Sequence, residues 1–122
     1  MGKNIKGTLL ASAARTATTS SSDISNYSCK GVRVFINVTV HAVSAAIVPT
    51  IEVKDPISGT YTAVATGAAI TGTGHTVITV YPGATVAANV TLSTVVGRTW
   101  RVTMTPGNAN SATYSVGYEM IV

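Results

Sequence analysis

The longest uncharged stretch of this chain constrains its fold more than any other feature. Between Asp55 and Arg98 the sequence has no Asp, Glu, Lys or Arg, and it consists largely of Thr, Ala, Val and Gly. Such a composition favours β-strands, and a β-prone surface without charges invites edge-to-edge association when it is exposed. We therefore expect residues 56–97 to supply much of the contact surface to neighbouring chains, which indicates an assembly protein.

The overall composition narrows the fold class. The chain has 122 residues, which is enough for one domain with its own core, and strong helix formers such as Glu, Lys and Gln are scarce. Eight Lys and Arg side chains exceed four Asp and Glu side chains, for a net charge of +4. Because the cations form no basic run, the charge favours an acidic protein surface and predicts no specific nucleic-acid site.

Alternation with a period of two residues marks the strands. The clearest case is residues 32–40, where Val or Ile occupies every even position and is expected to face a core. Asp55, Pro56 and Gly59 predict a tight turn that makes a hairpin of the strands before and after it. Further strands are expected at residues 51–54, 60–64, 76–81, 99–105 and 114–121, the last two paired antiparallel, with residues 86–92 either a strand or an irregular crossover.

About seven to nine short strands separated by turn signals are typical of a sandwich or small barrel. We predict an all-β fold, a single antiparallel β-sandwich of jelly-roll, β-tulip or immunoglobulin-like type. Residues 15–122 would form the sandwich domain. Residues 1–14 would form either an N-terminal arm that docks on a neighbour or an edge strand of the same sandwich.

The sequence predicts no catalytic, cofactor or metal site, and we expect no enzyme. His41 and His75 lack further ligands at metal-binding spacing, and the single Cys29 is expected to be a small buried side chain. Trp100 shares its predicted face with Val102 and Met104, which favours a core anchor over an exposed platform. The N-terminus has no signal-peptide pattern and no stretch is typical of a membrane helix, so we expect no membrane partner.

Five segments that together span most of the chain are characteristic in their sequence: Gly7–Thr16, Lys54–Tyr61, Tyr81–Gly83, Arg98–Val102 and Ala112–Gly117. In these segments the chain resembles the short structural proteins encoded among the head and tail genes of tailed bacteriophages. The resemblance implies a non-enzymatic virion component, a decoration or cement protein on the outer capsid, made in the host cytoplasm. The implied partners are the major capsid protein and further copies of the chain, as an oligomer in the virion.

Two other functions stay open at this point. One is a subunit of the tail, neck or fibre of the same virion. The other is a carbohydrate- or cell-surface-binding module that uses tyrosines near turns, namely Tyr27, Tyr61 and Tyr81. The residues expected to contact partners are Lys3, Ile5, Lys6, Leu9 and Leu10 in the N-terminal segment and Thr73, Gly74 and Ala84 in loops.

Overall fold

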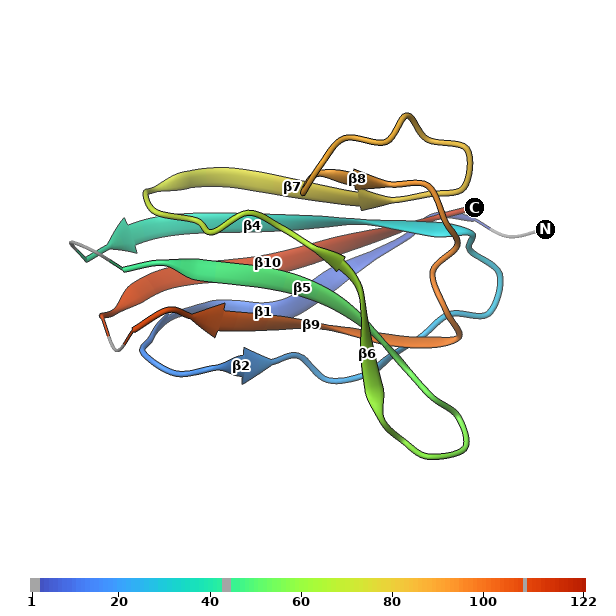
Figure 1. The fold of residues 1–122 in the computed structure, drawn as a ribbon, viewed down its shortest axis with the longest axis horizontal. Coiled ribbons are helices and arrows are strands. Elements are labelled where there is room, and N and C mark those ends of the chain that lie inside the picture. The colour runs from blue at the N-terminus through green and yellow to red at the C-terminus, as the bar shows by residue number, and fades with distance from the viewer. Residues whose placement is uncertain (1–2, 43–44, 109) are drawn as a thin grey trace.

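The computed structural model describes residues 3–42, 45–108 and 110–122, and every regular element within them is a β-strand (Figure 1). The strands follow the alternation and turn signals of the sequence. Three of them are only two residues long and connect the longer ones. The bounds are β1 Ile5–Arg15, β2 Thr19–Ser20, β3 Ile24–Ser25, β4 Gly31–His41, β5 Ile47–Lys54, β6 Tyr61–Thr66, β7 Gly74–Val80, β8 Thr91–Leu92, β9 Thr99–Pro106 and β10 Ala112–Ile121.

The strands form two sheets. The first has the order β1-β10-β4-β7-β8, and the second has the order β2-β9-β5-β6, with β3 also paired to β9. All pairs are antiparallel except that β8 runs parallel to β7. The two sheets pack face to face, which confirms the predicted β-sandwich, and both termini lie at the same end of it (Figure 1).

The pairing is nested along the chain. The innermost pair is the hairpin of β5 and β6, followed outward by β4 with β7, by β2 and β3 with β9, and by β1 with β10. Successive pairs alternate between the two sheets. This order is that of a jelly roll, so the fold matches the first of the three predicted sandwich types.

The central strands β4 and β10 of one sheet and β5 and β9 of the other supply most of the core. Their inward residues are apolar, and Trp100 is fully buried with its ring edge-on to Tyr118 at a centroid distance of 5.5 Å. The prediction that Trp100 anchors the core is confirmed. Its indole N–H has no hydrogen-bond partner, a cost that its buried apolar surface must offset.

The predicted hairpin around Asp55 is also confirmed. The Asp55 carboxylate accepts the backbone N–H of Ile57 at 2.8 Å and that of Ser58 at 3.3 Å. Gly59 has a φ of 76°, a left-handed conformation that glycine adopts without strain. These residues hold the turn between β5 and β6.

Two sequence-based predictions about strand pairing and facing are wrong. Strands β9 and β10 do not pair with each other: β9 lies between β5 and the short strands β2 and β3, while β10 lies between β1 and β4. The chain crosses from one sheet to the other after Pro106, because both strands have an apolar face that must meet the core from opposite sides. Alternation alone does not reveal which sheet a strand joins.

Val40 is the second discrepancy, because alternation placed it on the core face of β4. It is 61% exposed, whereas the preceding even positions of β4 are buried. The register between β4 and β10 shifts at this point, since Val40 pairs with Thr113 but Val38 pairs with Tyr114. The bulged residue, Thr39, reverses the facing of the strand end.

Two glycines of the first sheet offer a matched test of this packing. A methyl group on Gly31 would clash with the carbonyl oxygen of Val80, whereas one on Gly117 would find only ordinary contact, 3.5 Å from the Gly7 carbonyl. We expect Gly31→Ala to lower the free energy of unfolding by about 1–3 kcal/mol and Gly117→Ala to change it by less than about 0.5 kcal/mol. Urea denaturation of both variants measures this, and equal effects would contradict the packing described.

Candidate interface surfaces

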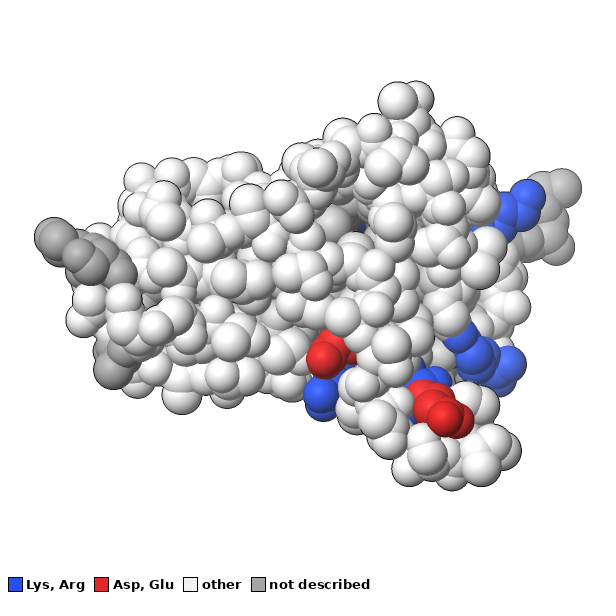
Figure 2. Space-filling view, viewed as in Figure 1, with Lys and Arg blue, Asp and Glu red and all other residues white. Residues whose placement is uncertain are grey.

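Most of the visible face of the sandwich carries no charge, and the charged atoms gather toward one end of it (Figure 2). This contrast arises from two surfaces. One is a charged corner on the outer face of β5, β6 and β9. The other is the side of the molecule formed by residues 62–97, which we call the uncharged flank and which includes the free edges of β6 and β8.

The charged corner is held together by a hydrogen-bonded network around Tyr61. The Tyr61 hydroxyl donates to Asp23 at 2.6 Å, and the Lys54 ammonium group lies 3.3 Å from the other oxygen of the same carboxylate. The Arg101 guanidinium stacks on the Tyr61 ring, 3.4 Å from its centroid. Arg101 also donates to Glu52 at 2.9 Å. The network therefore joins β5, β6 and β9 to the segment between β2 and β3.

The hydroxyls of Thr103 and Ser20 extend this network toward the sheet edge. Thr103 donates to Glu52 at 2.6 Å, and its hydroxyl oxygen lies 2.9 Å from that of Ser20. Three of the four acidic side chains of the sequence, Asp23, Glu52 and Asp55, thus already accept hydrogen bonds within the molecule. The hydrogen bonds of this corner hold neighbouring strands together, and they leave little unpaired charge for a partner.

The uncharged flank exposes large apolar side chains instead. Val86 is 63% exposed, Val90 is 50% exposed and Val95 is 57% exposed. Single exposed valines are ordinary on protein surfaces. These three, however, belong to a stretch of sequence, residues 62–97, that contains no Asp, Glu, Lys or Arg. Covering such a surface requires no desolvation of a charge.

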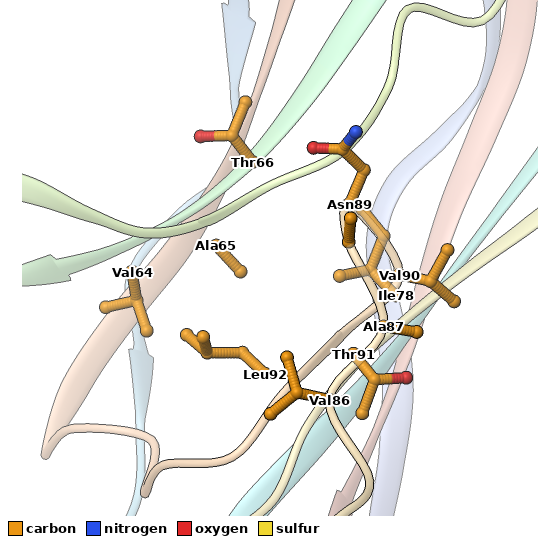
Figure 3. Close-up of a pocket in the computed structure, with 11 residues that line it drawn as sticks. Val64, Ala65, Thr66, Ile78, Val86, Ala87, Asn89, Val90, Thr91 and Leu92 are labelled. Atoms are coloured by element: carbon orange, nitrogen blue, oxygen red, sulfur yellow. The ribbon is translucent and has the colours of Figure 1, made fainter.

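A cleft of about 180 Å³ lies within the uncharged flank, between β6 and the loop that leads into β8. Leu92 points toward Val64 and Ala65 across it, with Val86 beside Leu92 (Figure 3). The cleft lies beside the end of β6 at Thr66, which is one of its lining residues.

The loop that walls the cleft has hydrogen bonds of its own. Ala87 and Thr91 exchange backbone hydrogen bonds at 3.2 and 2.9 Å, and the turn between them places Asn89 at a φ of 61°. Asn tolerates this left-handed conformation better than most residues. The backbone N–H of Thr79 donates to Val90 and so ties the loop to β7. The cleft is therefore preformed.

Strand β1 provides a different candidate surface, since it is the outermost strand of its sheet. It pairs with β10 on one side, and no strand of the described ranges pairs with its other side. An unpaired edge of this length is a template for an added strand. Residues 5–8 and 11–14 of β1 are exposed, while Leu9 and Leu10 are half-buried against the core.

Arg15 closes the irregular end of this edge. The register between β1 and β10 shifts between Leu10 and Ala13. There the Arg15 guanidinium donates to the carbonyls of Ala11 at 2.5 Å, Ala13 at 3.3 Å and Tyr114 at 2.7 Å. It also lies over the Tyr114 ring, 4.6 Å from the centroid. One side chain thus satisfies backbone groups of two strands where the regular ladder is interrupted.

The residues predicted to contact partners fall into separate places. Lys3 precedes β1, and Ile5, Lys6, Leu9 and Leu10 lie on it, at the opposite edge of the sheet from the uncharged flank. Thr73 is exposed just before β7, and Gly74 begins that strand rather than a flexible loop, with a φ of 132°. Ala84 is half-buried in the turn after β7.

The sequence did not predict the Asp23–Tyr61 network, the hydrogen bonds from Arg15 to the carbonyls of β1 and β10 (the Arg15 plug), or the cleft beside Leu92. These features depend on pairs of residues far apart in the chain. The one local signal was Asn89, whose type is common at left-handed positions.

Within the described ranges, no group of three or more His, Cys, Asp or Glu side chains could hold a metal ion. No helix in the same residues is long and apolar enough to cross a membrane. No protein-family model, curated protein or solved structure matches the chain.

The charged corner makes a prediction about pH. The hydrogen bond from the Tyr61 hydroxyl is the main cause that lowers the pKa of Asp23 below its ordinary value of 3.8, and Lys54 lowers it further. A carboxyl with a depressed pKa in the folded state stabilises the fold above its unfolded pKa, and this contribution is lost as the pH falls through the folded pKa. Tyr61→Phe should therefore raise the Asp23 pKa toward 3.8 and reduce the loss of stability in acid.

Carbon-detected NMR titration of the Asp23 carboxyl measures the shift, together with urea denaturation at neutral and acid pH. Tyr81→Phe is the matched control, because the Tyr81 hydroxyl donates to the main-chain oxygen of Val122 and not to Asp23. An Asp23 pKa unchanged by Tyr61→Phe would show that the hydroxyl does not control it.

The edge of β1 makes a second prediction. Arg15→Ala should lower the free energy of unfolding by about 1–3 kcal/mol, because three carbonyls lose a charged donor. Arg15→Lys should recover only part of this, since an ammonium group lacks the planar set of donors. Arg98→Ala removes a cation stacked on Tyr27 at 4.2 Å and serves as the control. An Arg15→Ala variant as stable as Arg98→Ala would refute the role given to Arg15.

Proposed function

We propose that the chain is a non-enzymatic structural subunit that docks on a larger protein assembly, and specifically a decoration or cement protein on the outer surface of a tailed-bacteriophage capsid. Its partners would be the major capsid protein and further copies of itself, in the virion. The observation that carries the proposal is the uncharged flank, where Val86 and Val90 are exposed in the lining of a preformed cleft and Val95 is exposed in the segment after β8.

The physical reason is the contrast between the two surfaces. On the charged corner, Asp23, Glu52 and Arg101 already have partners within the subunit, so this corner can remain in solvent. The flank combines exposed apolar side chains with the free edges of β6 and β8, a combination that favours coverage by another protein. Jelly rolls serve in viral capsids and also in lectins, so the fold alone does not decide the function.

Two alternatives follow from the same surfaces. A tail, neck or fibre subunit would use the flank in the same way at another place in the virion. A carbohydrate-binding module would need exposed aromatic rings, and Tyr27 is 78% exposed. Against this alternative, Tyr61 is covered by Arg101 and bonded to Asp23, and the Tyr81 hydroxyl is bonded to Val122. A glycan array probed with the purified protein tests it.

Immunogold labelling of purified virions from the source of the sequence tests the proposal. A decoration protein gives label over the head surface and a copy number comparable with that of the major capsid protein, measured by gel densitometry. Label confined to the tail or neck, with few copies, would support the alternative virion subunit. Virions without label would overturn both assignments.

A charge placed on the flank should separate docking from folding. Val90→Lys is expected to weaken binding to particles stripped of the protein about tenfold or more, because the ammonium group must be desolvated, and to leave the unfolding midpoint nearly unchanged, because the side chain is half exposed. Thr105→Lys, at an exposed position outside the flank, is the control. Thr73→Lys tests the predicted loop, whereas Gly74 is a poor choice because its φ of 132° strains any side chain.

A further inference from the structure

The two halves of the β1 edge differ in how they are protected. Near its C-terminal end, the Arg15 guanidinium covers the carbonyls of Ala11 and Ala13. The N-terminal half, Ile5–Leu10, has no such cover among the described residues, and Lys6 is its one charged side chain. Proteins commonly guard an unneeded edge with charges, bulges or proline. The register with β10 is regular over Ile5–Thr8 and shifts between Thr8 and Leu10, so Ile5–Thr8 is the part of the edge open to an added strand.

A shallow depression of about 500 Å³ lies beside this half, on the outer face of the sheet. Two cross-strand rows of residues line it. Lys6 pairs with Glu119, which pairs with Arg33, and in the next row Thr8 pairs with Gly117, which pairs with Phe35. Since Gly117 has no side chain, the depression lies between Thr8 and Phe35. Added strands gain affinity from main-chain hydrogen bonds and specificity from pockets of this kind.

The charges around the depression are mainly positive. Lys6 and Arg33 flank Glu119 in the register, and Lys3 precedes the strand. Within the described ranges the ion pairs are Lys54 with Asp23 and Arg101 with Glu52, so Lys6 and Arg33 are in neither of them. The site therefore complements an acidic segment.

A second copy of this chain does not supply such a segment. Asp23 and Glu52 lie in the charged corner, Asp55 caps its own turn, and Glu119 lines the depression itself. Antiparallel pairing of two β1 strands over Ile5–Leu10 would also bring the Lys6 residues of both copies within a few positions of each other, which is unfavourable for like charges.

We propose that the N-terminal half of β1 binds an extended acidic segment of a different protein as an added strand. Its carboxylate would lie near Lys6, and a long apolar side chain two positions along the added strand would reach over Thr8 toward the depression above Gly117. This inference deepens the proposed function and rests on it for the setting, because there the carrier of the segment would be another component of the particle.

Short capped peptides that carry Phe two positions from a variable residue, so that both side chains lie on the same face of an added strand, provide the probe. They are made in Glu, Gln and Lys versions and titrated into the purified protein. The Glu peptide should bind at least about tenfold more tightly than the Gln peptide, and the Lys peptide should bind least. Amide hydrogen exchange should slow on β1 in the complex, and N-methylation of alternate peptide amides should abolish binding, because an added strand needs its N–H donors.

Four variants locate the site. Lys6→Glu should reverse the order of the Glu and Lys peptides, while Arg98→Glu, which makes the same change in net charge on the other sheet, should not. Gly117→Val should weaken binding of the Glu peptide about tenfold by filling the depression, with Gly117→Ala as the folded reference because its methyl group meets only ordinary contact. Three results would each overturn the inference. They are equal binding of all three peptides, slowed amide exchange confined to strands other than β1, and a dimer of the chain that Lys6→Glu dissociates.

The same variants distinguish this inference from the proposed function. If Lys6→Glu and Gly117→Val occupy virion heads as fully as the unaltered protein, the inference is wrong and the capsid assignment stands. If the Glu peptide binds β1 as described but virions carry no label, the binding edge stands and the capsid assignment is wrong.

Discussion

The close packing of the four central strands is the constraint on which the rest of the structure depends. Strands β4 and β10 lie against β5 and β9, and their inward side chains, with Trp100 at 0% exposure, form the core. Because nested pairing puts these strands in the middle of the two sheets, β1, β6 and β8 are left at the edges. The strands that bury the core are therefore not those available to a partner.

The placement of charge follows from this arrangement. Six of the charged side chains lie on or beside β3, β5 and β9: Asp23, Glu52, Lys54, Asp55, Arg98 and Arg101. Most of these charges are tied to one another or to Tyr61, and so they stabilise the crossing segment between β2 and β3. The flank opposite β1 has no charged side chain. A partner could therefore cover it without the free-energy cost of desolvating a charge. This distribution of charge is what the proposed docking of the flank on another protein requires.

The sequence predicted the local features well, because they depend on neighbouring residues. Alternation identified the buried residues of β4 up to Val38, turn chemistry identified the hairpin at Asp55, and the shared face of Trp100 and Met104 identified a core anchor. The pairing of β9 and β10 was predicted wrongly, since two apolar strands joined by a turn can enter the same sheet or opposite sheets. The facing of Val40 failed because a bulge at Thr39 breaks the period.

The candidate surfaces were only partly accessible from the sequence. The lack of charge between Asp55 and Arg98 indicated the flank, and the N-terminal residues pointed to β1. The cleft, the Arg15 plug and the depression over Gly117 each join residues from distant parts of the chain. Such features arise from the nested topology, which no local pattern encodes.

Hydroxyl-radical footprinting of the chain, free and in its native assembly, tests the central claim most directly. The account predicts strong protection of Val86, Val90 and Leu92 in the assembly, while Tyr27 and Lys54 in and beside the charged corner keep their reactivity. Equal reactivity of the flank in the free and assembled states, or protection of the charged corner instead, would contradict the claim that the uncharged flank is the covered surface.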